Sequence, residues 1–253
     1  MSGHSKWATT KHRKAAQDSK RSALFSKLSR NITVAAKVGG DPNPENNASL
    51  AAAVAKAKAQ SMPKANIDSA IKKAFAAGED ASNYETVIYE GYGPAGVAVY
   101  CEALTDNRNR TAADVRSAFS HSGGNLGTTG SVSFQFERRG RVIVPKTACE
   151  DEDELFMAVA EAGGEEYDDE DEEWVVWTDP TELSNVSKGL ESQGLEVKGS
   201  ELTMVPTTYT QVTPSDAKKV MRLIDRLEDL DDLQDVYHTM EMTDEVIAAL
   251  DEE

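Results

Sequence analysis

Residues 84–124 read YETVIYEGYGPAGVAVYCEALTDNRNRTAADVRSAFSHSGG, and within this stretch the period of the apolar residues changes. Apolar and polar residues alternate through YETVIYEGYG and again through GVAVYCEALTD, and each run is bounded by Gly or Asp, as strands usually are. In the next segment Ala112, Val115 and Phe119 share one helical face, and the pair Gly123-Gly124 ends that helix. The stretch therefore predicts the order strand, strand, helix.

The 76 residues 131–206 repeat this order and extend it to ββαβαβ. Strand patterns occupy 131–139, 141–146, 172–179 and 196–206, and helical patterns occupy 151–163 and 180–194.

Beyond residue 206, the segments 208–212, 214–230 and 233–240 predict strand, helix and strand. They would complete the strand-strand-helix of residues 84–124 into the same ββαβαβ order. The chain is therefore predicted to be α+β, with an N-terminal helical domain followed by two ferredoxin-like ββαβαβ domains, the third inserted into the second. We expect the boundaries 1–79, 80–130 plus 207–253, and 131–206, with mainly antiparallel sheets.

The N-terminal part is rich in Ala, Lys, Ser and Leu, and predicts three helices at about 17–38, 47–60 and 64–77. Asn46 or Asn47 suits the start of the second helix, because Asn is a preferred N-terminal cap. The alanine content allows these helices to pack closely.

Charge is distributed unevenly along the chain, whose net charge is -17. Residues 1–40 hold nine Lys and Arg against Asp18 alone, a net charge of +8, so the remainder carries -25. Within this segment Lys6, Arg13 and Lys20 recur every seven residues and Lys27 continues the series, which on a helix makes one slowly drifting stripe. Such a stripe can follow a phosphate backbone, and Trp7 could stack on a base. The alternative is a solvated helix face.

Two further segments could contact phosphate. Arg108 and Arg110 in DNRNRT follow a strand and precede a helix, where free backbone N–H groups would also face an anion. The alternative is that Asp106 or Asn107 only caps the helix while the arginines are solvated.

The glycine-rich stretch Gly123 to Gly130, which contains Asn125, could wrap backbone amides around an anion, although it lacks the Lys-Ser/Thr of a P-loop. The alternative is a connection in which glycines supply positive φ angles. The literal match to G-x-G-x-x-G at Gly91 to Gly96 precedes a strand pattern, so it predicts a hairpin turn and not a nucleotide site. We expect the acidic run 165–173 to form a solvated loop or an edge strand.

Several classes of function are not indicated. No catalytic constellation emerges, and His and Cys residues lack metal-ligand spacing, so we expect no enzyme activity, cofactor, metal or small-molecule substrate. Cys101 and Cys149 are expected to be buried. No apolar run is long enough for a membrane helix and no secretory signal is evident, so we expect a cytoplasmic protein with no membrane partner. No oligomer seam is evident, and we expect a monomer.

The segments GHSKWATTKHRKAAQDSKR, VAAKVGG, MPK, YEGYGPAGVAVYCEALTDNRNRTAADVRSAF and GGNLGTTGSVSFQFER together closely resemble the YebC/PmpR family. The resemblance covers nearly the whole chain and is densest at 3–21 and 89–137. It implies the same helical domain followed by two α+β domains. It also implies a role in gene expression, because members are described as DNA-binding transcriptional regulators, while others resemble ribosome-associated translation factors, including a mitochondrial translational activator of cytochrome c oxidase.

The sequence thus predicts a non-enzymatic nucleic-acid-binding regulator. Its partner would be DNA, or alternatively ribosomal or transfer RNA on the ribosome, since the resemblance also implies a link to relief of stalling at proline runs. A third alternative is an acidic adaptor that binds a basic protein. The predicted nucleic-acid-binding residues are His4, Lys6, Trp7, Lys11, His12, Arg13, Lys14, Lys20, Arg21, Lys27, Arg30, Lys64, Arg108, Arg110 and Asn125.

Overall fold

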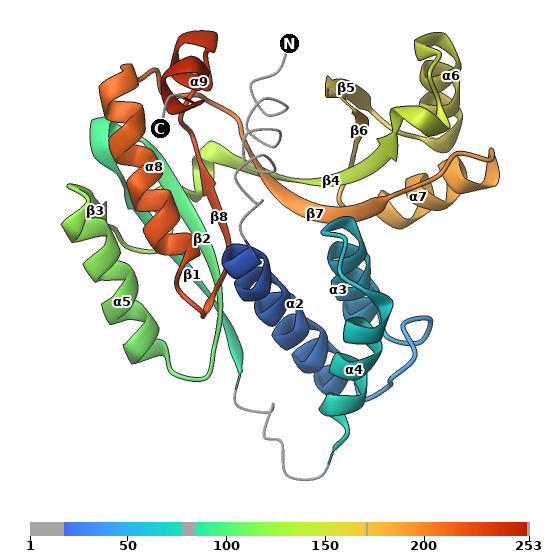
Figure 1. Cartoon of the computed structure of the whole chain (residues 1–253), viewed down its shortest axis with the longest axis horizontal. Helices are drawn as coiled ribbons and strands as arrows, with labels where there is room; N and C mark the ends of the chain where they lie inside the picture. The colour runs from blue at the N-terminus through green and yellow to red at the C-terminus, as the bar shows by residue number, and fades with distance from the viewer. Residues whose placement is uncertain (1–17, 77–83, 171, 252–253) are drawn as a thin grey trace. The chain divides into compact units, whose positions relative to one another are not determined.

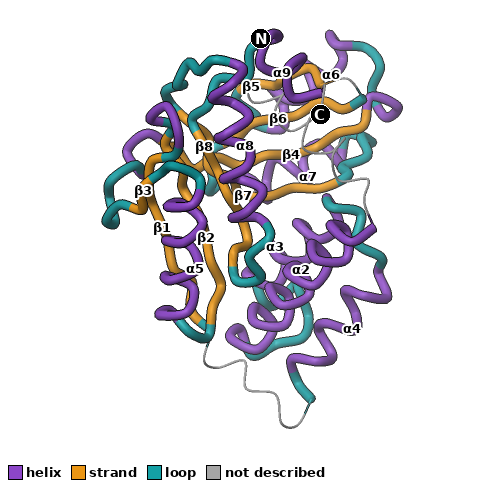
Figure 2. The backbone as a smooth tube through the Cα atoms, turned by 60° about the vertical axis from the view of Figure 1, so that its left-hand side comes forward, coloured by secondary structure: helices purple, strands orange, loops and turns teal. Residues whose placement is uncertain are grey.

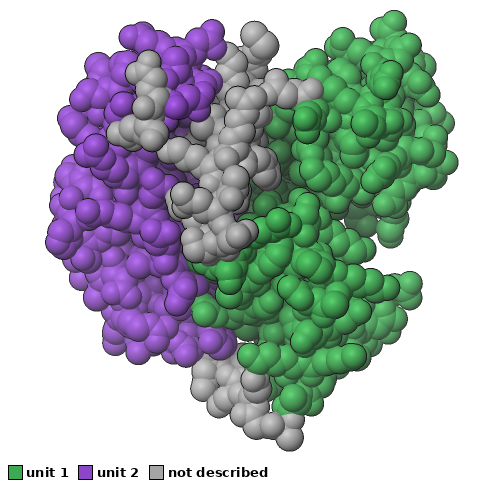
Figure 3. Space-filling model, in the orientation of Figure 1, with its two compact units in different colours: residues 1–81, 138–203 green, residues 82–137, 204–253 purple. Residues whose placement is uncertain are grey.

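The structure, a computed structural model, describes residues 18–76, 84–170 and 172–251. Helices form its first part, and two four-stranded sheets with their own helices follow (Figure 1). Contacts between Cα atoms group the chain into two compact units, residues 1–81 with 138–203, and residues 82–137 with 204–253 (Figure 3).

Residues 18–76 form the three predicted helices, α2 (Asp18–Gly39), α3 (Ala48–Ala59) and α4 (Lys64–Ala74). Their core is made largely of small and aliphatic side chains, among them the fully buried Ile32 and Leu50. Because α3 has the sequence ASLAAAVAKAKA, its buried face consists mostly of methyl groups, which lets the neighbouring helices approach closely.

Asn47 fixes the connection between α2 and α3. Its Oδ1 accepts the backbone N–H of Leu50 at 3.0 Å, and its Nδ2 donates to the carbonyls of Ala35 at 3.0 Å and Asp41 at 3.2 Å. The choice between Asn46 and Asn47 is thereby decided for Asn47, which joins two helix ends with one buried amide. Gly39 is required here, since a Cβ at that position would overlap the Asn47 side chain.

The first sheet has the strand order β3-β1-β2-β8, with β1 (Glu85–Tyr92), β2 (Ala98–Thr105), β3 (Asn125–Leu126) and β8 (Leu233–His238). All of its pairings are antiparallel. The helices α5 (Arg108–His121) and α8 (Pro214–Glu228) pack on one face, and α9 (Asp244–Asp251), which the sequence did not predict, packs against α8 (Figures 1 and 2). On the other face Ala98 and Tyr100 pack with Phe136 and Tyr237.

The predicted hairpin turn at Gly91 to Gly96 is confirmed, because β1 and β2 are antiparallel neighbours on either side of it. A short 3-10 turn, Pro94–Gly96, closes the hairpin with positive φ angles at Ala95 and Gly96. Gly93 packs under α8, where an added Cβ would lie 3.0 Å from Leu223 Cδ2.

The second sheet has the order β5-β6-β4-β7, with β4 (Phe136–Pro145), β5 (Glu166–Glu170), β6 (Glu173–Thr178) and β7 (Gly199–Pro206). The strand β6 runs antiparallel to both β4 and β5. Two helices, α6 (Glu152–Ala162) and α7 (Leu183–Ser192), bury Leu155, Val159, Val186 and Leu190 against the sheet residues Val142, Val144, Trp174 and Val176.

The predicted α+β class is confirmed, but the second sheet departs from the predicted ββαβαβ order. Its elements follow the order βαββαβ, because 131–146 holds one strand and not two, and the acidic run supplies the additional strand β5. Gly140 does not separate two strands. It lies inside β4 where the sheet needs a residue without a side chain, since a Cβ there would come 2.5 Å from Thr178 Cγ2. The acidic run is an edge strand, one of the two alternatives expected for it.

The predicted strand at 208–212 is also wrong. This segment forms a single bridge between Thr210 and Met240, and the third strand of the first sheet is instead the short β3. The chain leaves the first sheet after β3, builds the second sheet, and returns to the first with β8. The division into 1–79, 80–130 plus 207–253, and 131–206 stays a prediction. Cys101 and Cys149 are both buried, as expected.

Candidate nucleic-acid interface

The helices α2 to α4 carry the basic part of the described chain. Residues 18–76 contain ten Lys and Arg against four Asp and Glu, a net charge of +6 in a chain whose net charge is -17. Exposed cations come from all three helices: Arg21, Lys58, Lys64, Lys72 and Lys73. Three of these, Lys58, Lys72 and Lys73, were missed as site residues because the charge count stopped at residue 40; the same count continued to residue 76 would have found them.

Many predicted site residues lie outside the described residues, namely His4, Lys6, Trp7, Lys11, His12, Arg13 and Lys14. Lys20 belongs to the first turn of α2, but its side chain is not described.

The other predicted cations of this segment differ in exposure. Arg21 and Lys64 are exposed, Arg30 is partly buried, and Lys27 is 8% exposed. The burial of Lys27 counts against a phosphate contact by its ammonium group, because such a contact requires the group at the surface.

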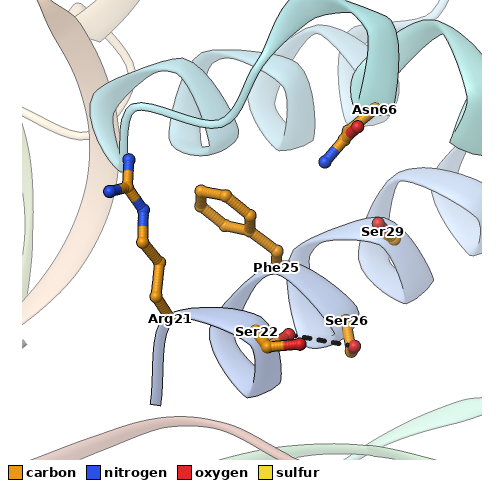
Figure 4. A pocket seen from close by; sticks show the side chains of 6 residues that line it. All are labelled: Arg21, Ser22, Phe25, Ser26, Ser29 and Asn66. Carbon is orange, nitrogen blue, oxygen red and sulfur yellow. Dashed lines mark hydrogen bonds between the residues drawn. The ribbon is translucent and has the colours of Figure 1, made fainter. Parts of the chain in front are cut away.

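An open hollow of about 410 Å³ lies between α2 and α4. Figure 4 shows its lining, with Phe25 at the centre, Arg21 on one side and the Asn66 amide on the other. The remaining lining residues are the hydroxyl-bearing Ser22, Ser26 and Ser29 of α2. A cation, an aromatic ring, hydroxyls and an amide thus share one recess.

Local helix geometry explains this arrangement. Arg21 and Phe25 are four residues apart on α2, so their side chains are neighbours, and the guanidinium carbon lies 5.4 Å from the ring centroid. Deeper in the helix pair, Thr33 Oγ1 donates to the carbonyl of Ala70 at 3.0 Å and holds α2 to α4. Phe25 is half-buried, with one part packed on the helical core and the rest in the hollow.

Arg108 and Arg110 serve structural contacts. Asn107 caps α5, with Oδ1 accepting the N–H of Arg110 at 3.1 Å. The Arg110 guanidinium donates to Asp232 at 2.7 Å and to Asp106 at 2.9 Å, and these hydrogen bonds raise its pKa. Arg108 forms an ion pair with Glu85 at 3.6 Å. The cap by Asn107 matches the alternative interpretation, and both arginines are exposed, but their ion pairs with carboxylates were not part of either interpretation.

The glycine-rich stretch does wrap backbone amides around an anion, but that anion belongs to the chain. The Glu90 carboxylate accepts the N–H groups of Gly130 at 2.7 Å and of Val132 and Ser133 at 2.8 Å each. Glu90 is only 3% exposed. Burial raises the pKa of this carboxyl, but the three backbone donors outweigh burial and hold the pKa below its ordinary value.

These bonds also explain why Val132 and Ser133 do not continue the strand pattern, since amides bonded to Glu90 cannot donate to a neighbouring strand. Gly123 and Gly130 have φ angles of +78° and +86°. They thus supply the positive φ angles that the alternative interpretation, a glycine-containing connection, expected. Asn125 is exposed and pairs with Tyr92 in the short strand β3, so it belongs to the first sheet and does not line the hollow between α2 and α4.

No three His, Cys, Asp or Glu side chains of the described residues are placed to hold a metal ion. Within the same residues, no helix is both long and apolar enough to cross a membrane.

Comparison with known proteins identifies the family. A model of the TACO1/YebC protein N-terminal domain matches residues 5–77, and a model of the TACO1/YebC second and third domain matches residues 84–240. This chain belongs to the TACO1/YebC family. The resemblance seen in the sequence is thereby confirmed.

Relatives within the TACO1/YebC family are similar along their whole length. A protein of Bifidobacterium longum named a probable transcriptional regulatory protein is 50% identical over 100% of both chains. One of Rubrobacter xylanophilus with the same description is 50% identical over 98% of both. The crystal structure of a conserved hypothetical protein from Aquifex aeolicus is 43% identical, has a TM-score of 0.77, and covers 90% of this chain and 93% of its own. The α+β fold is therefore shared with a solved structure.

Proposed function

We propose that this protein regulates gene expression by binding nucleic acid through its basic helical segment. The observation that supports this most is the separation of charge, because residues 18–76 carry +6 within a chain of -17. An acidic body repels a polyanion, so binding would be confined to the helical segment. The names of the bacterial relatives point to transcription, and hence to DNA, as the first target.

Phosphate contacts would supply most of the affinity. Binding of this kind weakens steeply with salt, since each neutralised phosphate releases counterions. Sequence specificity would then be low, because phosphate contacts position a protein without reading bases. The same cationic helices could enter a structured RNA, so ribosomal RNA is the alternative target that the family resemblance suggests.

A double variant that removes two positive charges tests the proposal. Lys58→Gln with Lys72→Gln removes two exposed cations of the helical segment, and Arg138→Gln with Lys188→Gln removes two exposed cations elsewhere. If both lysines contact phosphates of duplex DNA, the slope of log K against log salt falls by about 2 in magnitude for the first variant. The matched control should leave the slope unchanged. Equal slopes for both variants and the wild type would contradict a role for the helical segment.

The choice between DNA and the ribosome needs a separate experiment. Lysate is sedimented through a sucrose gradient, and the protein is detected in each fraction, with and without residues 1–21. Migration with ribosomal particles that depends on residues 1–21 would favour the translation factor. A protein that stays at the top of the gradient would favour DNA regulation.

A second candidate function, an adaptor for a basic protein, is favoured by the surface of α6. Phe156 and Met157 are 57% and 66% exposed on this helix, next to the exposed carboxylates of Asp153 and Glu154. An apolar pair beside carboxylates suits a basic segment that also carries apolar residues. The acidic edge strand is a less suitable surface, because Arg139 forms ion pairs with Glu165 and Glu166 and Lys146 forms one with Asp169.

Binding of a synthetic Lys/Leu helical peptide would test this candidate. The double variant Phe156→Ser with Met157→Ser keeps all charges, and Phe134→Ser, at a residue 73% exposed, is its control. Loss of binding only in the α6 variant would support the adaptor, and equal binding by all three proteins would refute it.

A further inference from the structure

The hollow between α2 and α4 has the size of a small-ligand site. Its volume of about 410 Å³ lies within the range of pockets that hold small molecules, about 300–1,000 Å³. The bases of a duplex are paired and stacked, so none of them can project into this hollow unless it leaves the stack. A ligand that reaches Phe25 must therefore be small, or must be one unit of a polymer that projects from its chain.

The lining matches the parts of a nucleotide. Arg21 is an exposed guanidinium, and within the described residues no carboxylate pairs with it, so it is available to a phosphate. Phe25 offers an aromatic ring, on which any base can stack. The Asn66 amide and the α2 hydroxyls offer donors and acceptors for a sugar or a base edge.

The recess is also held in shape before any ligand binds. The bond from Thr33 Oγ1 to the Ala70 carbonyl joins the two helices that form its walls, and the bond is buried. Phe25 packs on the core of the helical segment, so its ring is positioned by neighbours. A site that is already ordered loses less entropy on binding than a flexible one.

We propose that this hollow holds one unpaired nucleotide of the bound nucleic acid, with its phosphate on Arg21 and its base against Phe25. This inference rests on the proposed function, and it adds that single-stranded or looped regions are the preferred targets. Exposed cations elsewhere on the helices would contact the flanking phosphates, while the hollow would discriminate unpaired from paired nucleotides.

The test compares two fluorescent probes, a 12-nucleotide oligo(U) and a 12-base-pair duplex, by anisotropy with the full chain. Phe25→Leu keeps the apolar packing and removes the ring. We expect this variant to bind oligo(U) about 5- to 150-fold more weakly, as the loss of one stacked base implies, with an unchanged salt slope. Duplex binding should stay at the wild-type level.

The control is Phe75→Leu, which removes an exposed ring of the same helical segment that does not line the hollow. Phe25→Tyr retains a ring and should keep wild-type affinity, which separates lost stacking from a damaged fold. Arg21→Gln should lower the single-strand salt slope by about 0.7.

Equal oligo(U) affinity for wild type, Phe25→Leu and Phe75→Leu would overturn the nucleotide site and leave the proposed function standing. An equal loss on both probes would overturn it too, since the effect would not depend on unpaired bases. Failure of the wild type to bind either probe would overturn both proposals.

Discussion

Replacing Glu90 by Gln should destabilise the unit formed by 82–137 and 204–253. The carboxylate accepts three backbone N–H groups, one on Oε1 and two on Oε2. Glutamine has one side-chain oxygen. If that oxygen keeps the bonds to Val132 and Ser133, the NH2 group faces the N–H of Gly130, and two donors then oppose each other without an acceptor. Hydrogen bonds to a charged group contribute about 1.5–3 kcal/mol each, and removal of a buried charge returns part of that, so we expect a net loss of about 2–4 kcal/mol.

Hydrogen exchange is the suitable assay, because all three Trp residues lie outside this unit and tryptophan fluorescence would not report on it. Amides of residues 127–136 should exchange faster in the Glu90→Gln variant, while those of 18–76 should not change. Glu137→Gln is the matched control, since Glu137 is an exposed carboxylate of the same unit.

The effect also has a defined pH dependence. The pKa of Glu90 is lowered from 4.5, so its stabilising contribution is complete above that value and is lost as pH falls through the lower folded pKa. The difference between wild type and variant should therefore be constant near neutral pH and shrink in acid. Unchanged exchange of residues 127–136 at neutral pH would refute the assignment of Glu90 as the anion that orders this loop.

Three further substitutions test other parts of the fold. Gly140→Ala places a Cβ 2.5 Å from Thr178 Cγ2 and should cost about 1–3 kcal/mol in urea unfolding followed by the fluorescence of the neighbouring tryptophans; an unchanged midpoint would contradict it. Asp232→Asn weakens an acceptor shared by Arg110 and two buried threonines and should cost about 2 kcal/mol, visible as faster exchange in α5; unchanged exchange there would count against the network. Asn47→Ala removes the α3 cap and should cost about 1–2 kcal/mol, seen in the exchange of Leu50 and its neighbours; α8 provides the internal reference.

Local patterns predicted most of the elements, because their signals lie within the elements themselves. The helices α2 to α4 and the β1–β2 hairpin follow from apolar period and from Gly, Pro and Asn at their ends. The errors arose where a distant partner decides the conformation. Residues 131–133 alternate like a strand, but Glu90, some 40 positions earlier, accepts the amides of Val132 and Ser133. Gly140 resembles a strand end, but its contact is with Thr178 on the next strand.

In the candidate site too, features local to one helix can be predicted from sequence, and features that depend on a distant residue cannot. The pairing of Arg21 with Phe25 four positions later can be obtained from sequence, since both residues are local to α2. The charge stripe that begins at Lys6 stays a prediction, because most of it lies outside the described residues. The participation of Asn66 could not be obtained from sequence, because it depends on how α4 packs against α2. Arg110 as a phosphate ligand stays a prediction, but its ion pair with Asp232 could not be predicted, because Asp232 lies 122 residues further along the chain.

The return of the chain to the first sheet with β8 has a consequence during synthesis. The strand β2 pairs on its outer side with β8, in a register that joins Val99 to His238. At a translation rate of about 5–20 residues per second, β2 leaves the ribosome on the order of ten seconds before its partner. Throughout that interval the nascent protein carries an unpaired strand edge. The strands of the second sheet all lie between residues 136 and 206, so they are synthesised within the interval and are complete before β8 begins at Leu233. The order of synthesis thus favours folding of the second sheet before β8 completes the first sheet.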